Sequence, residues 1–135
     1  MAKDERTRPV SAVQVREYLA KAEEYAVAAT SELEAERGIA ATSLAIHAGI
    51  SAADAVCGAR LGRRAAGQHH DEVLNLLQQA GKDGDELEKH LRRLLPMKTK
   101  VEYESDDIPR STASKAVERA QKCVDIARRV VASRP

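Results

Sequence analysis

The stretch GRRAAGQHHDE, residues 62–72, contains residue types that act on phosphate esters. Arg63 and Arg64 precede His69 and His70, and each arginine–histidine pair has four to six residues between its members. A histidine near its ordinary pKa can take a proton from a 2′-hydroxyl or give one to a leaving oxygen. An arginine can hold the scissile phosphate through two parallel hydrogen bonds and offset charge in the transition state. The stretch could therefore be the active site of a metal-independent endoribonuclease.

The same stretch also suits the boundary between two helices. Arg63 and Arg64 follow the end of one helix, where positive charge is favourable to the helix dipole. Asp71, or a neighbouring side chain, can cap the free amides at the start of the next helix. Three interpretations stay open: an active site, a solvated pair of helix ends, or a contact for RNA or a nucleotide that is not cut.

A second set of polar residues lies in the segment IAATSLAIHAGISAADAVCGARLG, residues 39–62, which is apolar or small nearly all the way round. That pattern predicts a central buried helix. Ser43, His47, Ser51 and Asp54 follow one side of it, as an exposed edge or facing a groove or subunit interface. His47 and Asp54 are candidate ligand-binding residues. A Ser-His-Asp hydrolase is not expected, because one helix side spreads these groups along its axis.

The element before this segment is predicted to be a long amphipathic helix. Ser11 and Gln14 form an S-x-x-Q capping box at its start. Apolar residues then recur at three- and four-residue steps, which places them on one stripe. The sequence ERG at 36–38 ends the helix, with Gly38 as its C-cap.

The second half of the chain continues the helical pattern. A third helix covers residues 70–80, and GKDG at 81–84 breaks it. A fourth helix runs from Glu86 until Pro96 kinks or ends it. The chain then resumes helical structure in MKTKVEY, residues 97–103.

The last element is predicted to be a helix at 111–132, capped by Ser111 or Thr112. No segment shows the alternation of apolar and polar residues that is typical of a strand. The sequence therefore predicts an all-α fold, an up-and-down bundle of about five helices joined by short loops.

The length and composition predict one domain with an unusual core. The 135 residues divide into a disordered N-terminal tail, 1–10, and a single bundle domain, 11–132. The chain has no Trp and no Phe, and it is rich in alanine, which buries little apolar area per residue. We therefore expect close helix approach and burial of further surface in a homodimer.

The net charge of the chain and the motifs that its sequence lacks exclude several classes of protein. The net charge of +1, from 22 basic and 21 acidic residues, argues against a general nucleic-acid binder but allows a local basic patch. The start of the sequence lacks the apolar region of a signal peptide, and no apolar run approaches the ~20 residues of a membrane span, so we expect a cytoplasmic protein without a membrane partner. Cys57 and Cys123 are expected to be buried free thiols. No metal or cofactor is expected, because zinc-ligand spacing and a Gly-rich phosphate loop are both missing from the sequence.

The order of these segments resembles the HEPN domain family. The resemblance is carried by SLAIHAGISAADAVCGARLG, HHDEVLNLL and LRRLLPMKTKVEY, followed by the long helix at 111–132, and it covers residues 11–132. It implies a four- or five-helix bundle that is often a homodimer. Many members of the family are toxins that cut RNA without a metal, with an Arg, four to six residues and a His as their signature. Others bind RNA or nucleotides, and some pair with a small nucleotidyltransferase that acts as antitoxin.

Two departures from the family pattern favour a non-catalytic member. Ala65 follows the arginines where the family prefers Asn, Asp or His, and the arginine–histidine pair spans a glycine-containing loop instead of a late helix. Our preferred hypothesis is a HEPN-like binding or interaction module for RNA, a nucleotide or a protein partner. The rivals are a metal-independent endoribonuclease using Arg63 or Arg64 with His69 or His70, and a purely structural dimeric docking domain. Besides those four, the candidate ligand-binding residues are Arg60, Arg92, Arg93, His47 and Asp54.

Overall fold

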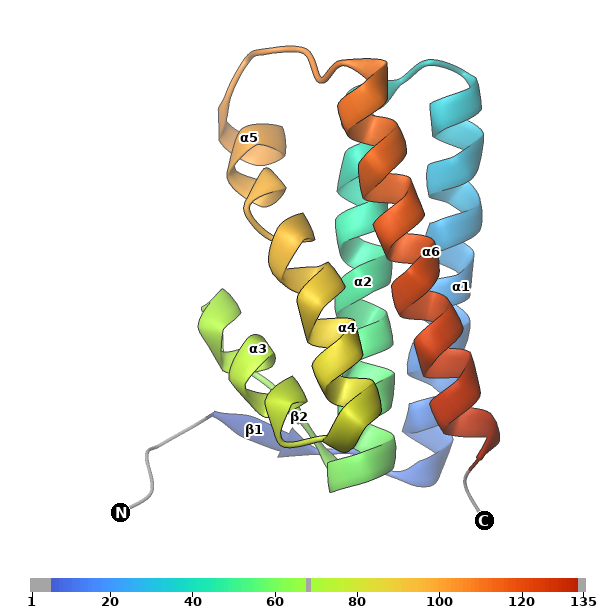
Figure 1. Cartoon of the computed structure of the whole chain (residues 1–135), viewed down its shortest axis with the longest axis vertical. Helices are drawn as coiled ribbons and strands as arrows, with labels where there is room; N and C mark the ends of the chain where they lie inside the picture. The colour runs from blue at the N-terminus through green and yellow to red at the C-terminus, as the bar shows by residue number, and fades with distance from the viewer. Residues whose placement is uncertain (1–5, 68, 134–135) are drawn as a thin grey trace.

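A computed structural model describes residues 6–67 and 69–133 of the chain. Over these residues the fold is 79% helix and its helices pack together in a bundle, which confirms the predicted all-α class (Figure 1). Three long helices run side by side, and a fourth, shorter helix packs against two of them. In chain order the helices are α1 (Ala12–Glu34), α2 (Gly38–Leu61), α3 (His70–Gln78), α4 (Gly81–Leu94), the short α5 (Met97–Tyr103) and α6 (Arg110–Ala132).

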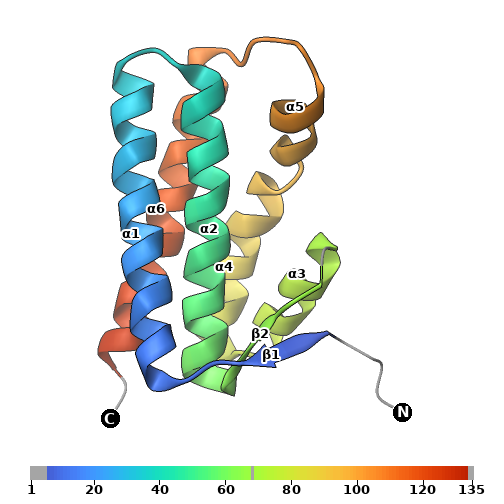
Figure 2. The same cartoon turned by 180° about the vertical axis from the view of Figure 1, so that it is seen from behind.

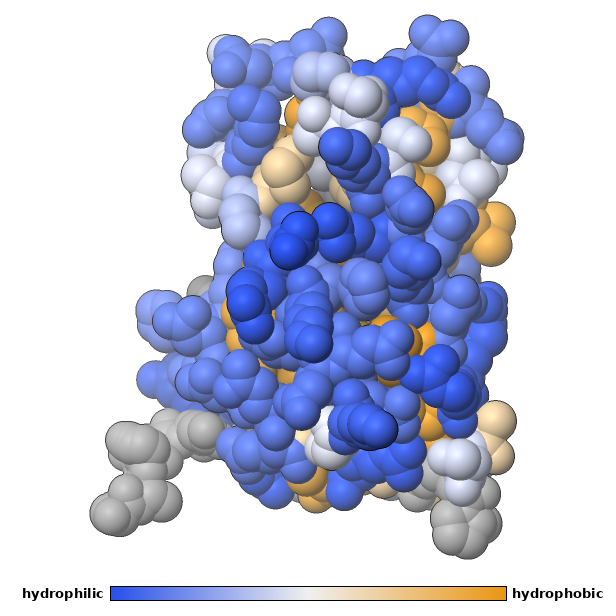
Figure 3. All heavy atoms as spheres, viewed as in Figure 1, coloured by the Kyte–Doolittle hydropathy of each residue, from blue (hydrophilic) through white to orange (hydrophobic). Residues whose placement is uncertain are grey.

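The central helix is α2, which contacts α1, α4 and α6. Its small residues let these neighbours approach closely, as the composition predicted. At Gly49, for example, a Cβ atom would lie only 3.0 Å from the side chains of Leu91 and Leu94. Cys57 and Cys123 are buried free thiols, as predicted. The outer surface over α4 and α6 is mostly hydrophilic, as expected for amphipathic helices that cover a core (Figure 3).

By length and composition, α2 could also cross a membrane, which corrects the expectation that no apolar run is long enough. This is weak evidence for a membrane span, because the core helix of a soluble protein passes the same test. In this structure 61% of the most apolar 18-residue window of α2 is buried inside the bundle.

The first helix begins as predicted and ends differently. Ser11 accepts a hydrogen bond from the backbone N–H of Gln14, and the Gln14 side chain accepts one from the backbone N–H of Ser11, which completes the capping box. The helix ends at Glu34, and Glu36 takes the left-handed conformation with φ 63°. Gly38 is not a C-cap: it opens α2, where a Cβ atom would collide with the carbonyl oxygen of Ile108.

Two further boundaries differ from the prediction. The break between the third and fourth helices is shorter and earlier than predicted: α3 ends at Gln78, and α4 already begins at Gly81, whose φ of 80° redirects the chain. Gly84 lies inside α4, where a Cβ atom would collide with the carbonyl oxygen of Leu77. The last helix begins at Arg110 after the extended Pro109, without a side-chain cap, so the predicted cap by Ser111 or Thr112 was wrong.

The largest correction concerns the N-terminal segment. Its described part is not a loose tail: β1 (Thr7–Pro9) pairs antiparallel with β2 (Arg63–Ala65), in the stretch where no strand was expected (Figure 2). Val10 is buried against α2, at Gly58. Three-residue strands are too short to show an alternating pattern, so the sequence carried no signal for them. The predicted disorder of residues 1–5 lies outside the described residues.

Candidate functional site

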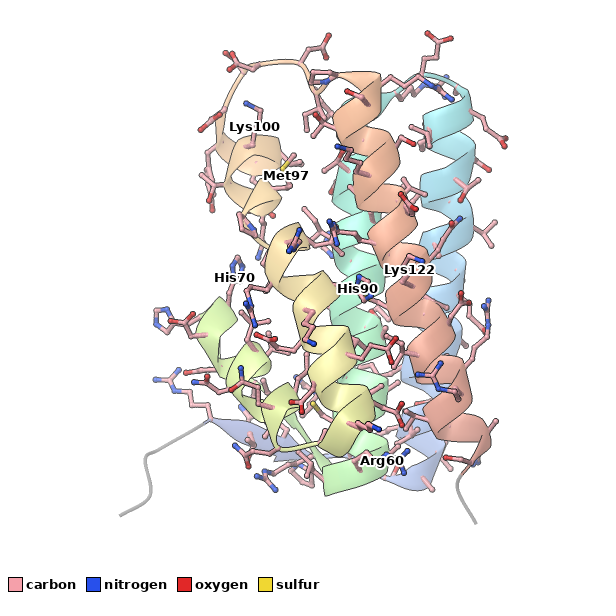
Figure 4. The ribbon with its side chains drawn as sticks, viewed as in Figure 1. Arg60, His70, His90, Met97, Lys100 and Lys122 are labelled. Carbon is pink, nitrogen blue, oxygen red and sulfur yellow. The ribbon has the colours of Figure 1, made fainter. Side chains whose placement is uncertain are left out.

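Several of the predicted site residues surround one open pocket of about 290 Å³, which we call the α2–α3 pocket. Its walls come from α2, from β2 and the loop after it, from the start of α3, and from the α4–α5 junction. Figure 4 shows His70 at the N-terminal end of α3, on the side that faces α5. The polar residues that line the pocket are Asp54, Arg64, His69, His70 and Lys98, and the apolar ones include Ile50, Val73 and Leu95.

Asp54 is the acidic group of this pocket, and it projects from the buried helix α2. Burial raises the pKa of its carboxyl group to about 7, although the positive charges of Arg64 and Lys21 act in the opposite direction. The carboxyl group therefore gains or loses its proton near neutral pH, a property that an exposed aspartate does not have.

Arg64 is held at the pocket by two contacts. Its guanidinium carbon lies 5.8 Å from the ring centroid of Tyr18, within the range of a cation–π interaction. One of its terminal nitrogens donates a hydrogen bond of 3.1 Å to the carbonyl oxygen of Ala65. The pairing of β2 with β1 fixes the backbone below it. Arg64 thus offers a positioned guanidinium group instead of a freely moving one.

The two histidines differ in their surroundings. His69 is exposed and stands at the N-cap position of α3, where no side chain caps the helix, so the predicted cap by Asp71 is missing. Asp71 does lie in the first turn, as predicted from the helix dipole. Burial and the nearby Lys98 lower the pKa of His70, against the opposite influence of Asp71 and Glu102. This shift favours the neutral form of His70, which can accept a proton.

The structure separates Arg63 from this group. Consecutive residues of a strand point to opposite faces, so Arg63 and Arg64 cannot both face the pocket. Arg63 donates a hydrogen bond of 3.2 Å to the side chain of Gln79. The spacing in the sequence fitted both arginines, and only the strand pairing selects Arg64.

Most of the other predicted ligand-binding residues also lie elsewhere. Arg60 forms an ion pair of 3.0 Å with Asp83, near the opposite end of α4 from the pocket (Figure 4). His47 is exposed and stacks on Tyr25, with 5.2 Å between ring centroids. Of the polar line on α2, Asp54 alone lines the pocket, because the rest of the line points to the surface or into the core.

Arg92 and Arg93 are neighbours on α4 with different contacts. Arg92 forms two hydrogen bonds, of 2.6 Å and 3.0 Å, to the carboxylate of the buried Glu88. Arg93 is exposed, and within residues 6–67 and 69–133 it makes no ion pair. Neither residue lines the α2–α3 pocket. The contacts assign Arg92 to the support of Glu88.

We expect Arg92→Ala to lower the melting temperature by several degrees without changing the affinity for a pocket ligand. Removing the partner of Glu88 leaves a carboxylate buried and uncompensated, which destabilises the folded state. Thermal unfolding followed by circular dichroism measures the effect. Arg93→Ala is the matched control and should melt close to the wild type, so equal melting of the two variants would contradict this role of Arg92.

Sequence reasoning missed Lys98 and Tyr18 as parts of the site. Lys98 lies at the start of α5 and reaches the pocket only because the chain turns at Pro96. Tyr18 lies on α1, far in sequence from Arg64, and has no motif around it. Contacts between such distant segments leave no spacing pattern in the sequence. In the part of the chain that the structure describes, no group of three His, Cys, Asp or Glu residues is placed to hold a metal ion.

Fold and site together define an all-α helical bundle with an open polar pocket at the side of its central helix. Comparison of the chain with models of known protein families and with curated proteins found no match.

Proposed function

We propose that the chain is a HEPN-like helical binding module that holds a phosphate-bearing ligand, RNA or a nucleotide, in the α2–α3 pocket. The observation that carries this proposal is that Arg64, His69, His70 and Lys98 line one pocket although they come from separate segments. Guanidinium and ammonium groups are the strong partners of phosphate oxygens in proteins. The pocket is open, so a phosphate group of a larger molecule can enter without movement of the helices.

The protonation of the pocket supports a ligand that is an anion. With Asp54 protonated, its carboxyl group can donate a hydrogen bond to a phosphate oxygen and adds no negative charge. The open pocket then contains two cationic side chains, Arg64 and Lys98, and two imidazole groups. When Asp54 ionises, its charge opposes the ligand at short range. Binding of phosphate is therefore expected to weaken as the pH rises past 7.

The test is the affinity of variants that lack the pocket cations. Arg64→Ala and Lys98→Ala should each bind a short single-stranded oligoribonucleotide, or AMP, about tenfold more weakly than the wild type, because each removes a charge-assisted hydrogen bond. Fluorescence anisotropy and calorimetry measure the two ligands. Lys115→Ala removes an exposed lysine from α6 and is the matched control. Variants that bind as tightly as this control would refute the proposal.

A metal-independent endoribonuclease is the second candidate, and one observation favours it. Asp54, whose pKa is near 7, shares the pocket with His70 and Arg64, so an acid, a base and a phosphate-holding group meet at one place. An assay on structured RNA with a chelator present distinguishes the candidates. Cutting that is lost when His69 and His70 are both replaced by alanine would favour the nuclease, whereas intact RNA beside a folded protein favours the binding module.

The assembly is part of the same proposal. We propose a cytoplasmic homodimer, because the alanine-rich core buries little area per residue and Val13 and Val27 remain exposed on α1. Light scattering after gel filtration measures the mass in solution.

A nucleotidyltransferase partner acting as antitoxin belongs to the nuclease alternative and would co-purify with the chain. A purely structural docking domain, the third candidate, would bind neither RNA nor nucleotides.

A further inference from the structure

Arg8, in the N-terminal strand, lies directly across the β1–β2 ribbon from Arg64. Residues opposite each other in an antiparallel pair project from the same face, with Cα atoms about 4.5–5.5 Å apart. Two backbone hydrogen bonds of 2.9 Å, from Val10 to Gly62 and from Ala66 to Arg6, hold the ribbon on either side of the pair. The fold thus places a second guanidinium group beside the one that lines the α2–α3 pocket.

This pair of like charges has no ion-paired carboxylate among residues 6–67 and 69–133, and the nearby Asp54 carboxyl group is neutral below its pKa of about 7. Neither Arg8 nor Arg64 forms an ion pair there, whereas other arginines, such as Arg60 and Arg129, are paired with carboxylates. Like charges directly opposite each other weaken a strand pair. The Tyr18 ring nevertheless offsets part of this repulsion, because it lies within cation–π range of the Arg64 guanidinium group. An anion between the two arginines would turn this unfavourable pair into a favourable one.

We infer that Arg8 and Arg64 form a two-guanidinium clamp for one phosphate group at the rim of the α2–α3 pocket. The inference rests on the proposed function and adds to it a binding residue from the N-terminal strand. A terminal phosphate group presents three oxygens, enough to accept hydrogen bonds from two planar donor forks at once. Arg8 is exposed, so its side chain can reach such a ligand without leaving a partner in the core.

The experiment measures the affinity of the full chain for AMP, with adenosine as the ligand that lacks the phosphate. Arg8→Ala should bind AMP about tenfold more weakly than the wild type, with adenosine unaffected. In the Arg64→Ala background, the same change should cost clearly less than tenfold, because a clamp acts as a unit. Arg8→Lys should recover only part of the affinity, because an ammonium group lacks the donor fork. Lys115→Ala is the control for a general loss of positive charge.

The outcomes separate this inference from the function on which it rests. If Arg8→Ala binds AMP as tightly as the wild type does, the clamp is overturned and the binding module still stands. The clamp is also overturned if the fold-loss of AMP affinity in the double variant equals the product of the losses in the two single variants. Two independent contacts would then act on the ligand. A wild-type chain that binds neither AMP nor an oligoribonucleotide refutes the proposed function and the clamp together. A thermal melt of Arg8→Ala that matches the wild type shows that the variant is folded.

Discussion

Asp54→Asn should be more stable than the wild type at pH 8 and nearly equal to it at about pH 4. Burial raises the pKa of the Asp54 carboxyl group from 3.8 to about 7, so between these values the folded state binds more protons than the unfolded state. The stability of the wild type therefore falls as the pH rises through this range and stays lower above it. Asparagine does not ionise and avoids this loss. The rise in pKa sets an upper bound on the order of 4 kcal/mol, and we expect a gain of about 1–3 kcal/mol at pH 8.

Urea unfolding of both proteins at several pH values between 4 and 8 measures this difference. Asp83→Asn is the matched control with the opposite sign, because hydrogen bonds from Arg129 and Arg60 lower the pKa of Asp83. That variant should lose stability at pH 7 relative to the wild type. A pH profile of Asp54→Asn parallel to that of the wild type would show that the buried carboxyl group does not titrate as described.

The same substitution tests the role of Asp54 in binding. With asparagine at this position, the affinity for AMP should vary less between pH 6 and pH 8 and should exceed that of the wild type at pH 8. If the protein is instead a nuclease that uses Asp54 as its acid or base, the variant should lose activity while it gains stability. The binding module therefore predicts a gain of AMP affinity at pH 8 in Asp54→Asn, whereas the nuclease predicts a loss of RNA cutting in the same variant.

Gly58→Val should destabilise the protein by about 1–3 kcal/mol and displace the N-terminal strand. A Cβ atom at this position of α2 would lie 2.7 Å from a methyl carbon of Val10 and 3.0 Å from one of Val15. Val15 is fully buried on α1, so Val10, directly after β1, has the easier route outward. The expected displacement separates Arg8 from Arg64. The affinity for AMP should then fall as it does in Arg8→Ala.

Chemical unfolding and calorimetry together check this result. A smaller side chain at residue 10 makes room for a methyl group, so Val10→Ala combined with Gly58→Ala should be more stable than the sum of the two single changes implies. If Gly58→Val matches the wild type in both stability and affinity for AMP, the contact between Val10 and α2 does not hold the strand.

The helices could be predicted because their signals are local. The capping box of Ser11 and Gln14, the apolar stripe that follows and the small-residue composition of α2 are all set by neighbours within one or two turns. The boundaries at Gly38 and Gly84 were misplaced for the opposite reason. Each of these glycines accommodates a backbone carbonyl from another segment, and a sequence does not show which segment will approach.

The candidate site was predicted in part. Residue types and spacing singled out Arg64, His69 and His70, and the polar line on α2 singled out Asp54. Spacing could not choose between adjacent arginines, because the choice depends on which face of a three-residue strand each one occupies. Lys98 enters the pocket after the turn that Pro96 marks, but no motif shows that the residues beyond this turn pack beside α2 and α3.

By itself the sequence determined the all-α class, the long helices and the alanine-rich core, because helix periodicity and burial depend on residues three and four positions apart. The tertiary structure alone decided that the N-terminal segment is a strand, that Arg8 stands beside Arg64, and that Asp54 has a pKa near 7. These properties arise from contacts between segments far apart in the chain, where desolvation and neighbouring charges depend on the complete packing.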